Sequence, residues 1–257
     1  MIDNKYIQRQ EAVDYPGKKL PVVFCIDVSG SMNQCEGGVF TGRTEFRDGQ
    51  NWNIMEGGHS IMQTLIERVK DFHAAMREDK KTSVTCQTAY VTFGDSANKI
   101  EDFGIVKNKQ APVDKLKAYA DNTYICDALE MSLKMLDDQK QVLKDMGNGY
   151  FQPWLIILTD GKAYDDPERI RQIKRELIQR QKNNKLIVYT MALSDDPEML
   201  QQIRGYSAYK PIPYDRNKEE LKKFFLFLKQ SISSISNSKI SDRVKPYTEP
   251  DNVSDLQ

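Results

Sequence analysis

Two short, uninterrupted apolar runs constrain the fold more than any other feature of this sequence. One is Leu-Pro-Val-Val-Phe-Cys-Ile at residues 20–26, and the other is Trp-Leu-Ile-Ile-Leu at residues 154–158. Apolar runs of this length without alternation are typical of strands covered on both faces in a parallel sheet. An aspartate follows each run closely, Asp27 in one case and Asp160 in the other. The two segments therefore predict the central strands of a parallel sheet.

The rest of the chain alternates between helix and strand patterns. Apolar residues at spacings of three and four predict helices near 61–76, 127–136, 170–177, 198–203 and 221–235. Further strands are predicted at 83–93, 99–106 and 186–193. Because residues 83–93 mix polar and apolar types, we expect this strand to be less completely buried than 20–26, with 99–106 as its antiparallel partner. We expect His73, beside the first helical stripe, to be a partly buried packing residue.

These patterns predict the fold class and the division of the chain. The fold is α/β, with a single doubly wound, mostly parallel sheet, one antiparallel edge strand and helices on both faces. The predicted domain spans residues 20–236, preceded by an N-terminal extension at 1–19 and followed by a polar tail at 237–257.

Composition excludes several classes of function. The 37 basic and 37 acidic residues balance to a net charge of zero, which argues against nucleic acid as a partner. The longest apolar stretches fall well short of the ~20 residues of a membrane-spanning helix. The N-terminus has no apolar leader, and the 4 cysteines have neither metal-ligand nor disulfide-framework spacing. We therefore expect a cytoplasmic protein with free thiols and no membrane partner.

The tetrapeptide Asp-Asp-Pro-Glu occurs at 165–168 and again at 195–198. Paired carboxylates suggest catalysis, but each motif stands between a predicted strand and a predicted helix. The pattern is typical of a helix start, with an aspartate as N-cap, proline as first helical residue and glutamate in the first turn. We predict N-caps at Asp166 and Asp196.

The ends of the two apolar runs suggest a metal site. Ligands of doubly wound sheets bind beyond the carboxyl ends of the strands. One strand continues as Asp27-Val-Ser29-Gly-Ser31, and the other as Thr-Asp160-Gly. Carboxylates and hydroxyls are hard oxygen ligands, which suit Mg²⁺, or Mn²⁺ or Ca²⁺ as alternatives. Only 2 histidines are present, which argues against zinc.

These motifs resemble the metal-ion-dependent adhesion site of von Willebrand factor A domains. Asp27-Val-Ser29-Gly-Ser31 matches the DxSxS motif, Leu-Thr-Asp160-Gly matches the second motif, and Thr123 stands where the family has its metal-binding threonine. The resemblance covers residues 20–236. Within this family the sequence most resembles the bacterial tellurite-resistance-associated group, whose members have Leu-Pro-Val at the first strand and Phe-Phe followed by Ser-Ile-Ser in the last helix, as this chain does.

The resemblance implies a function and a set of ligands. Asp27, Ser29, Ser31 and Thr123 would bind the metal directly or through water, and Asp160 would hold it directly or as an outer acceptor. The implied protein is a cytosolic scaffold or adaptor in a stress-response or defence system, not an enzyme. Its partner would supply an acidic side chain to the metal, and a protein kinase and a PP2C-type serine/threonine phosphatase are the partners that the group implies.

The main alternative is a Mg²⁺-dependent phosphohydrolase of the haloacid-dehalogenase type with Asp27 as nucleophile. That chemistry needs a second carboxylate two positions later, where this chain has Ser29. The sequence also lacks a GxxxxGK[ST] loop. The residues favour the binding module.

The sequence departs from the family pattern in two places. Residues 121 and 122 are Asp-Asn where Gly-Gly is common, and Cys126 replaces a frequent glycine, so we expect the Thr123 loop to be positioned differently. Residues 33–58 form a long insertion on the metal rim, with Gly-Gly pairs near both ends as expected flexible hinges. We expect it to be partly ordered and to cover or flank the metal, or else to be a passive decoration. Its possible metal ligands are Glu36, Glu45, Asp48 and Glu56.

Overall fold

The computed structural model describes residues 4–47, 50–161, 163–194, 196–214 and 219–237. The main sheet contains β1 (Leu20–Asp27), β6 (Cys86–Phe93), β7 (Asn98–Ile105), β8 (Trp154–Thr159), β9 (Ile187–Ala192) and β10 (Ile212–Pro213). The helices are α1 (Asn4–Asp14), α2 (Ile61–Glu78), α3 (Thr82–Thr85), α4 (Cys126–Asp145), α5 (Pro167–Lys182), α6 (Pro197–Ile203) and α7 (Glu219–Asn237). Four further strands, β2 (Cys35–Glu36), β3 (Val39–Arg47), β4 (Gln50–Glu56) and β5 (His59–Ser60), lie outside the main sheet.

The strand order of the main sheet is β10-β9-β8-β1-β6-β7. Strand β1 pairs in parallel with β8 on one side and with β6 on the other, and only β6–β7 is antiparallel among the pairs of this sheet. The predicted fold class and the central position of the two apolar runs are therefore confirmed.

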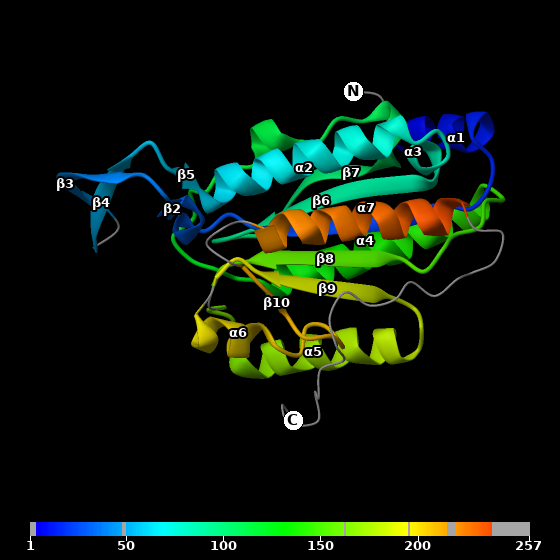
Figure 1. Ribbon diagram of the computed structural model, residues 1–257. Coiled ribbons are helices and arrows are strands. Elements are labelled where there is room, and N and C mark those ends of the chain that lie inside the picture. The colour runs from blue at the N-terminus through cyan, green and yellow to red at the C-terminus, as the bar shows by residue number, and fades with distance from the viewer. Residues whose placement is uncertain (1–3, 48–49, 162, 195, 215–218, 238–257) are drawn as a thin grey trace.

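Helices cover both faces of this sheet, as predicted. In β1, Leu20, Val22, Phe24 and Ile26 pack in one core with α2 and α7. Val23 and Cys25 point to the opposite core, which α4 and α5 cover. Figure 1 shows α2 and α7 lying across one face of the sheet. Because β1 is buried on both sides, each of its large apolar side chains contributes roughly 1.5–3 kcal/mol through burial.

Strand β6 corrects one expectation, because all eight of its residues are buried. Its polar side chains are buried by helices on both faces, and some find polar partners there. Gln139 Nε2 on α4 donates to Gln87 Oε1 over 2.9 Å. His73 Nε2 on α2 lies 2.5 Å from Tyr90 Oη, and His73 is buried, so its predicted packing role is correct.

The N-terminal extension contains α1, which lies along the open edge of β7. Gln8 Nε2 donates to the Phe103 carbonyl over 3.2 Å. The Ile105 backbone N–H donates to Glu11 Oε2 over 3.1 Å, and Asn108 Nδ2 donates to Glu11 Oε1 over 3.0 Å. Side chains of α1 therefore satisfy backbone groups that an edge strand would otherwise expose.

The insertion is an ordered β-hairpin. Strands β3 and β4 pair with each other, and the short strands β2 and β5 pair at its base just before α2. Figure 1 shows the hairpin extending away from the body of the protein, so it flanks the carboxyl edge of the sheet and does not cover it. Asp48 lies outside the described residues. Glu36 lies on β2, and Glu45 and Glu56 lie on the strands of the hairpin. The described residues contain no group of three or more His, Cys, Asp and Glu side chains that could hold a metal.

The glycine pairs at the base of the hairpin allow a close approach of two backbone segments. A Cβ on Gly38 would lie 2.7 Å from the Glu56 carbonyl oxygen, and one on Gly58 would lie 2.3 Å from the Gly37 carbonyl oxygen. Only glycine fits such contacts. The two pairs therefore have a packing role at the paired base, which the prediction of flexible hinges did not include.

Candidate metal centre

Three loops meet at the carboxyl edge of the main sheet. The first follows β1 and includes a 3₁₀ turn at Gly30–Asn33. The second precedes α4 and is hydrogen-bonded to the first. The Gly30 N–H donates to the Ala120 carbonyl over 2.7 Å, and the Ala120 N–H donates to the Val28 carbonyl over 3.1 Å. The third follows β8. The predicted metal ligands lie on these three loops or on the last residue of β1.

Asp27 ends β1 and is fully buried. Its Oδ1 accepts the Ser29 backbone N–H over 2.8 Å, and its Oδ2 accepts the Thr159 hydroxyl over 2.6 Å. Burial raises the pKa of the Asp27 carboxyl, and the hydrogen bonds from Ser29 and Thr159 oppose that rise. A buried carboxylate of this kind favours a nearby cation.

A chain of hydroxyl groups links the first loop to the third. Ser29 Oγ and Ser31 Oγ lie 3.0 Å apart, and the Ser31 hydroxyl donates to Asp160 Oδ1 over 3.0 Å. Burial and the neighbouring Asp27 carboxylate raise the pKa of Asp160. The structure therefore brings together four of the five predicted ligands: Asp27, Ser29, Ser31 and Asp160.

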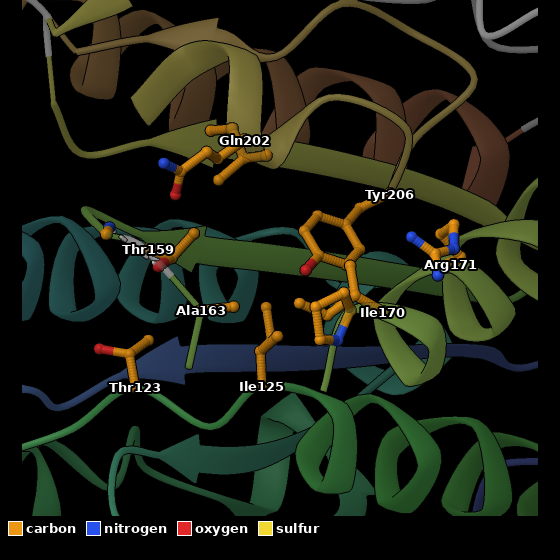
Figure 2. Close-up of a pocket in the computed structure, with 11 residues that line it drawn as sticks. Thr123, Ile125, Thr159, Ala163, Ile170, Arg171, Gln202 and Tyr206 are labelled. Carbon is orange, nitrogen blue, oxygen red and sulfur yellow. Dashed lines mark hydrogen bonds between the residues drawn. The ribbon is translucent and has the colours of Figure 1, made fainter. Parts of the chain in front are cut away.

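Thr123, the fifth, approaches from the second loop. It is buried, and its hydroxyl oxygen lies 3.9 Å from the position of a Cβ built on Gly161, the residue after Asp160. Its carbonyl accepts the Tyr164 N–H over 2.9 Å, which ties the second loop to the third. In Figure 2, Thr123 and Thr159 lie at the same end of a pocket. Thr123 is therefore next to the hydroxyl chain without being hydrogen-bonded into it.

Two further aspartates position the Thr123 loop. Asp165 accepts the backbone N–H groups of Ile125 and Cys126 over 2.7 and 3.1 Å at the start of α4. Asp95, in the turn after β6, accepts the N–H of Asn122 over 3.0 Å and that of Asp121 over 3.2 Å. Thus the loop that departs from the family pattern is held by carboxylates from two other loops.

The roles of Asp95, Asp165 and Thr159 were not predicted from the sequence. Asp95 and Asp165 act on backbone groups far away in the chain, which no local pattern reveals. Thr159 offered a weak signal, because a hydroxyl residue directly before Asp160 in a buried strand needs a polar partner.

The donor set fits a hard divalent cation. It consists of two carboxylates and three hydroxyls, the oxygen ligands that suit Mg²⁺. The described residues contain no group of three or more His, Cys, Asp and Glu that could hold a metal, so at this edge the hydroxyl oxygens would complete the set of ligands. Cys25 and Cys126 are buried in the core, and burial raises the pKa of both thiols to about 12. Neither thiol is poised to bind a soft metal at neutral pH.

Comparison with known proteins defines the class. The family model for the von Willebrand factor type A domain matches residues 22–162, more than half of the chain. This protein therefore belongs to the von Willebrand factor type A domain family. The matched range includes all five predicted ligands. No curated protein matches the chain in sequence.

Solved structures share the fold at low sequence identity. The PilB minor pilin from Streptococcus sanguinis has a TM-score of 0.55 and 17% identity, over 85% of this chain and 62% of the pilin chain. A von Willebrand factor type A protein from Catenulispora acidiphila has a TM-score of 0.52 and 14% identity, over 84% of this chain and 43% of the other. The conserved hypothetical protein BatB from Bacteroides thetaiotaomicron has a TM-score of 0.50 and 12% identity, over 85% of this chain and 100% of its own. This chain thus spans less than two thirds of the pilin and of the Catenulispora protein. Among the described residues, no helix is both long and apolar enough to cross a bilayer.

Proposed function

We propose that this protein is a metal-dependent protein-binding module. Asp27, Ser29, Ser31, Thr123 and Asp160 would hold one divalent ion, with Mg²⁺ as the best fit and Mn²⁺ or Ca²⁺ as alternatives. The observation that carries the proposal is the hydroxyl chain from Ser29 to Asp160. Because the Ser29 backbone N–H also donates to Asp27, this chain brings carboxylates from two neighbouring strand ends together at the ligand-binding edge of the sheet.

The donor set explains how such a metal would bind a partner. Three of the five oxygen donors are neutral hydroxyls, so the ion would keep more positive charge than in an all-carboxylate site. An ion with residual charge and an open position attracts an acidic side chain. A partner carrying an exposed aspartate or glutamate would therefore complete the coordination.

The biological setting is part of the same proposal and rests on the sequence resemblance. Domains of this family commonly serve as protein-interaction modules. The resemblance to the tellurite-resistance-associated group supports a cytoplasmic scaffold or adaptor in a stress-response or defence system, with a protein kinase and a PP2C-type phosphatase as candidate partners. No observation favours the phosphohydrolase alternative, since the second position after Asp27 carries the hydroxyl of Ser29.

The first test is Mg²⁺ binding by metal-free protein. Calorimetry should detect binding, and Mg²⁺ at 100 times its Kd should add about 2.7 kcal/mol to the free energy of unfolding. In a domain of this size that corresponds to a rise in Tm of roughly 5–10 °C. Thr123→Val, which deletes one hydroxyl with little change of shape, should reduce both effects.

Thr190→Val is the matched control, because Thr190 is buried on β9 and its hydroxyl has no partner in the described residues. It should bind Mg²⁺ as the wild-type chain does. If millimolar Mg²⁺, Mn²⁺ and Ca²⁺ all fail to bind the wild-type protein, the metal site is wrong. A partner that stays bound in chelator and to Asp27→Asn would show that protein binding does not use the metal.

A further inference from the structure

A pocket of about 320 Å³ adjoins the candidate metal centre. Thr123 and Thr159 line the end near the metal ligands, and Ile125, Ala163, Ile170 and Tyr206 line much of the remainder (Figure 2). We call it the apolar pocket. Because its first two lining residues also belong to the metal centre or contact it, a short segment bound at the metal would extend directly over the pocket.

Tyr206 gives this pocket a polar group without a partner. The side chain is 98% buried, since only 2% of Tyr206 is exposed. Its hydroxyl points into the pocket in Figure 2, and no hydrogen bond to it occurs among the described residues. The Lys174 ammonium lies 4.5 Å from the centre of the Tyr206 ring and donates to the Gln202 carbonyl over 2.8 Å. This cation–π contact helps to fix the position of the ring. Because this hydroxyl opens onto the pocket, a polar atom of an occupant can form a hydrogen bond with it, which would favour an occupant that carries such an atom.

Exposed tyrosines lie on the loops around the same edge. Tyr119 is 65% exposed, Tyr124 is 36% exposed and Tyr164 is 58% exposed. Each is fixed by its backbone: the N–H of Tyr164 donates to the Thr123 carbonyl, and those of Tyr119 and Tyr124 donate to the loops after β1 and β6. Exposed aromatic side chains on rigid loops are enriched at protein interfaces. The edge that carries the metal ligands therefore has the composition of a protein-docking surface.

We propose that the apolar pocket receives a tyrosine side chain from the same partner segment that supplies the carboxylate to the metal. The walls of Ile125, Ala163 and Ile170 suit the aromatic ring. The Tyr206 hydroxyl, which points into the pocket in Figure 2, suits the phenol oxygen of such an occupant. This inference rests on the proposed function and adds a specificity to it: the partner motif is an acidic residue with a tyrosine close by in sequence.

The test uses synthetic peptides of defined sequence. Each contains one aspartate followed, after zero, one or two glycines, by tyrosine, phenylalanine or alanine. Binding to the full chain is measured by fluorescence anisotropy with Mg²⁺ and with chelator. At the best spacing, we expect the tyrosine peptide to bind about tenfold more tightly than the alanine peptide, and more tightly than the phenylalanine peptide.

Two variants locate this preference in the pocket. Ala163→Phe fills the pocket and should reduce binding of the tyrosine peptide about tenfold while the Tm shift by Mg²⁺ is unchanged. Ala74→Phe, at an exposed position on α2, is its matched control. Tyr206→Phe should abolish the preference for tyrosine over phenylalanine. Tyr209→Phe, whose ring stacks on Tyr189 on the other side of the sheet, should keep it.

The outcomes separate the two proposals. If the alanine and tyrosine peptides bind equally, or if Ala163→Phe binds the tyrosine peptide as the wild type does, the pocket inference is wrong while Mg²⁺ binding stands. If the tyrosine peptide binds equally in chelator and is lost in Ala163→Phe, the pocket is correct and the metal-dependent function is wrong. If no peptide binds at any spacing, the motif proposed here is overturned.

Discussion

Removing the Asp165 carboxylate should destabilise the fold and loosen the metal centre together. This side chain lies on the loop after β8 but accepts two N–H groups at the start of α4, over 2.7 and 3.1 Å. Helix α4 has Ile125 at its N-cap position, so its own sequence supplies no capping side chain. A side-chain cap contributes 0.5–2 kcal/mol, and two bonds to an anionic acceptor place this one near the upper end, at about 2 kcal/mol. Asp165→Ala should therefore lower Tm by roughly 4–8 °C.

The same variant should weaken Mg²⁺ binding, because Thr123 stands two residues before the capped Ile125. Asp166→Ala provides a control of matched chemistry. Asp166 caps α5 by accepting the N–H groups of Glu168 and Arg169 over 3.0 and 3.1 Å, and these bonds do not involve the Thr123 loop. We expect the two variants to lose similar amounts of stability, and only Asp165→Ala to lose Mg²⁺ affinity.

Urea unfolding followed by circular dichroism measures the first effect, and calorimetry with Mg²⁺ measures the second. A stability loss below about 0.5 kcal/mol in Asp165→Ala would refute the capping argument. An equal loss of Mg²⁺ affinity in both variants would show that affinity follows overall stability and not the position of the Thr123 loop.

Three further predictions test the core, the site and the insertion. Burial, with Arg77 and Lys109 nearby, lowers the pKa of His73 from 6.5 to about 4. The folded state therefore favours neutral His73, and the free energy of unfolding should be highest above pH 6.5 and fall by up to about 3 kcal/mol toward pH 4. Urea titrations over this range should show that loss in the wild-type chain and a flatter profile in His73→Gln. Asp27→Asn should keep the circular-dichroism spectrum, because the amide retains an oxygen for the Ser29 N–H. It should lose stabilisation by Mg²⁺, because the substitution removes the charge that attracts the ion. A collapsed spectrum would make Asp27 a structural residue. Replacing residues 39–56 with a short Gly-Ser linker should change Tm by only a few degrees, since loop length has a weak effect on closure entropy. Mg²⁺ binding should stay intact, because the hairpin extends away from the sheet. Lost Mg²⁺ affinity in calorimetry would show that the hairpin supports the metal centre.

Local sequence patterns predicted the elements whose structure depends on local physics. The apolar runs of β1 and β8 determined the centre of the sheet, because only a strand covered on both faces can bury such runs. Asp166 and Asp196 cap α5 and α6 as predicted, since capping involves only the next three residues of the chain.

Features that depend on distant partners were missed. The α1 segment has few apolar residues at helical spacing, and Gln8 and Glu11 connect it to β7 across more than ninety residues. The buried polar residues of β6 depend on partners such as Gln139 on α4. The hairpin of the insertion lacks a clear alternation of polar and apolar residues, with a register irregularity between Phe40 and Thr44. The sequence therefore predicted partial order in this segment but not the two paired strands.

The two edges of the main sheet offer little free backbone to a second copy of this chain. On one side, the α1 side chains occupy the outward groups of β7. On the other side, β10 is only two residues long, which is too short to template another strand. The hairpin differs, because among the described residues β3 pairs with β4 alone, and Val39 and Phe46 on β3 are 74% and 70% exposed. At high concentration, edge-to-edge aggregation should therefore begin at this ribbon and not at the large sheet, and a lysine or proline placed on its outer edge would suppress it.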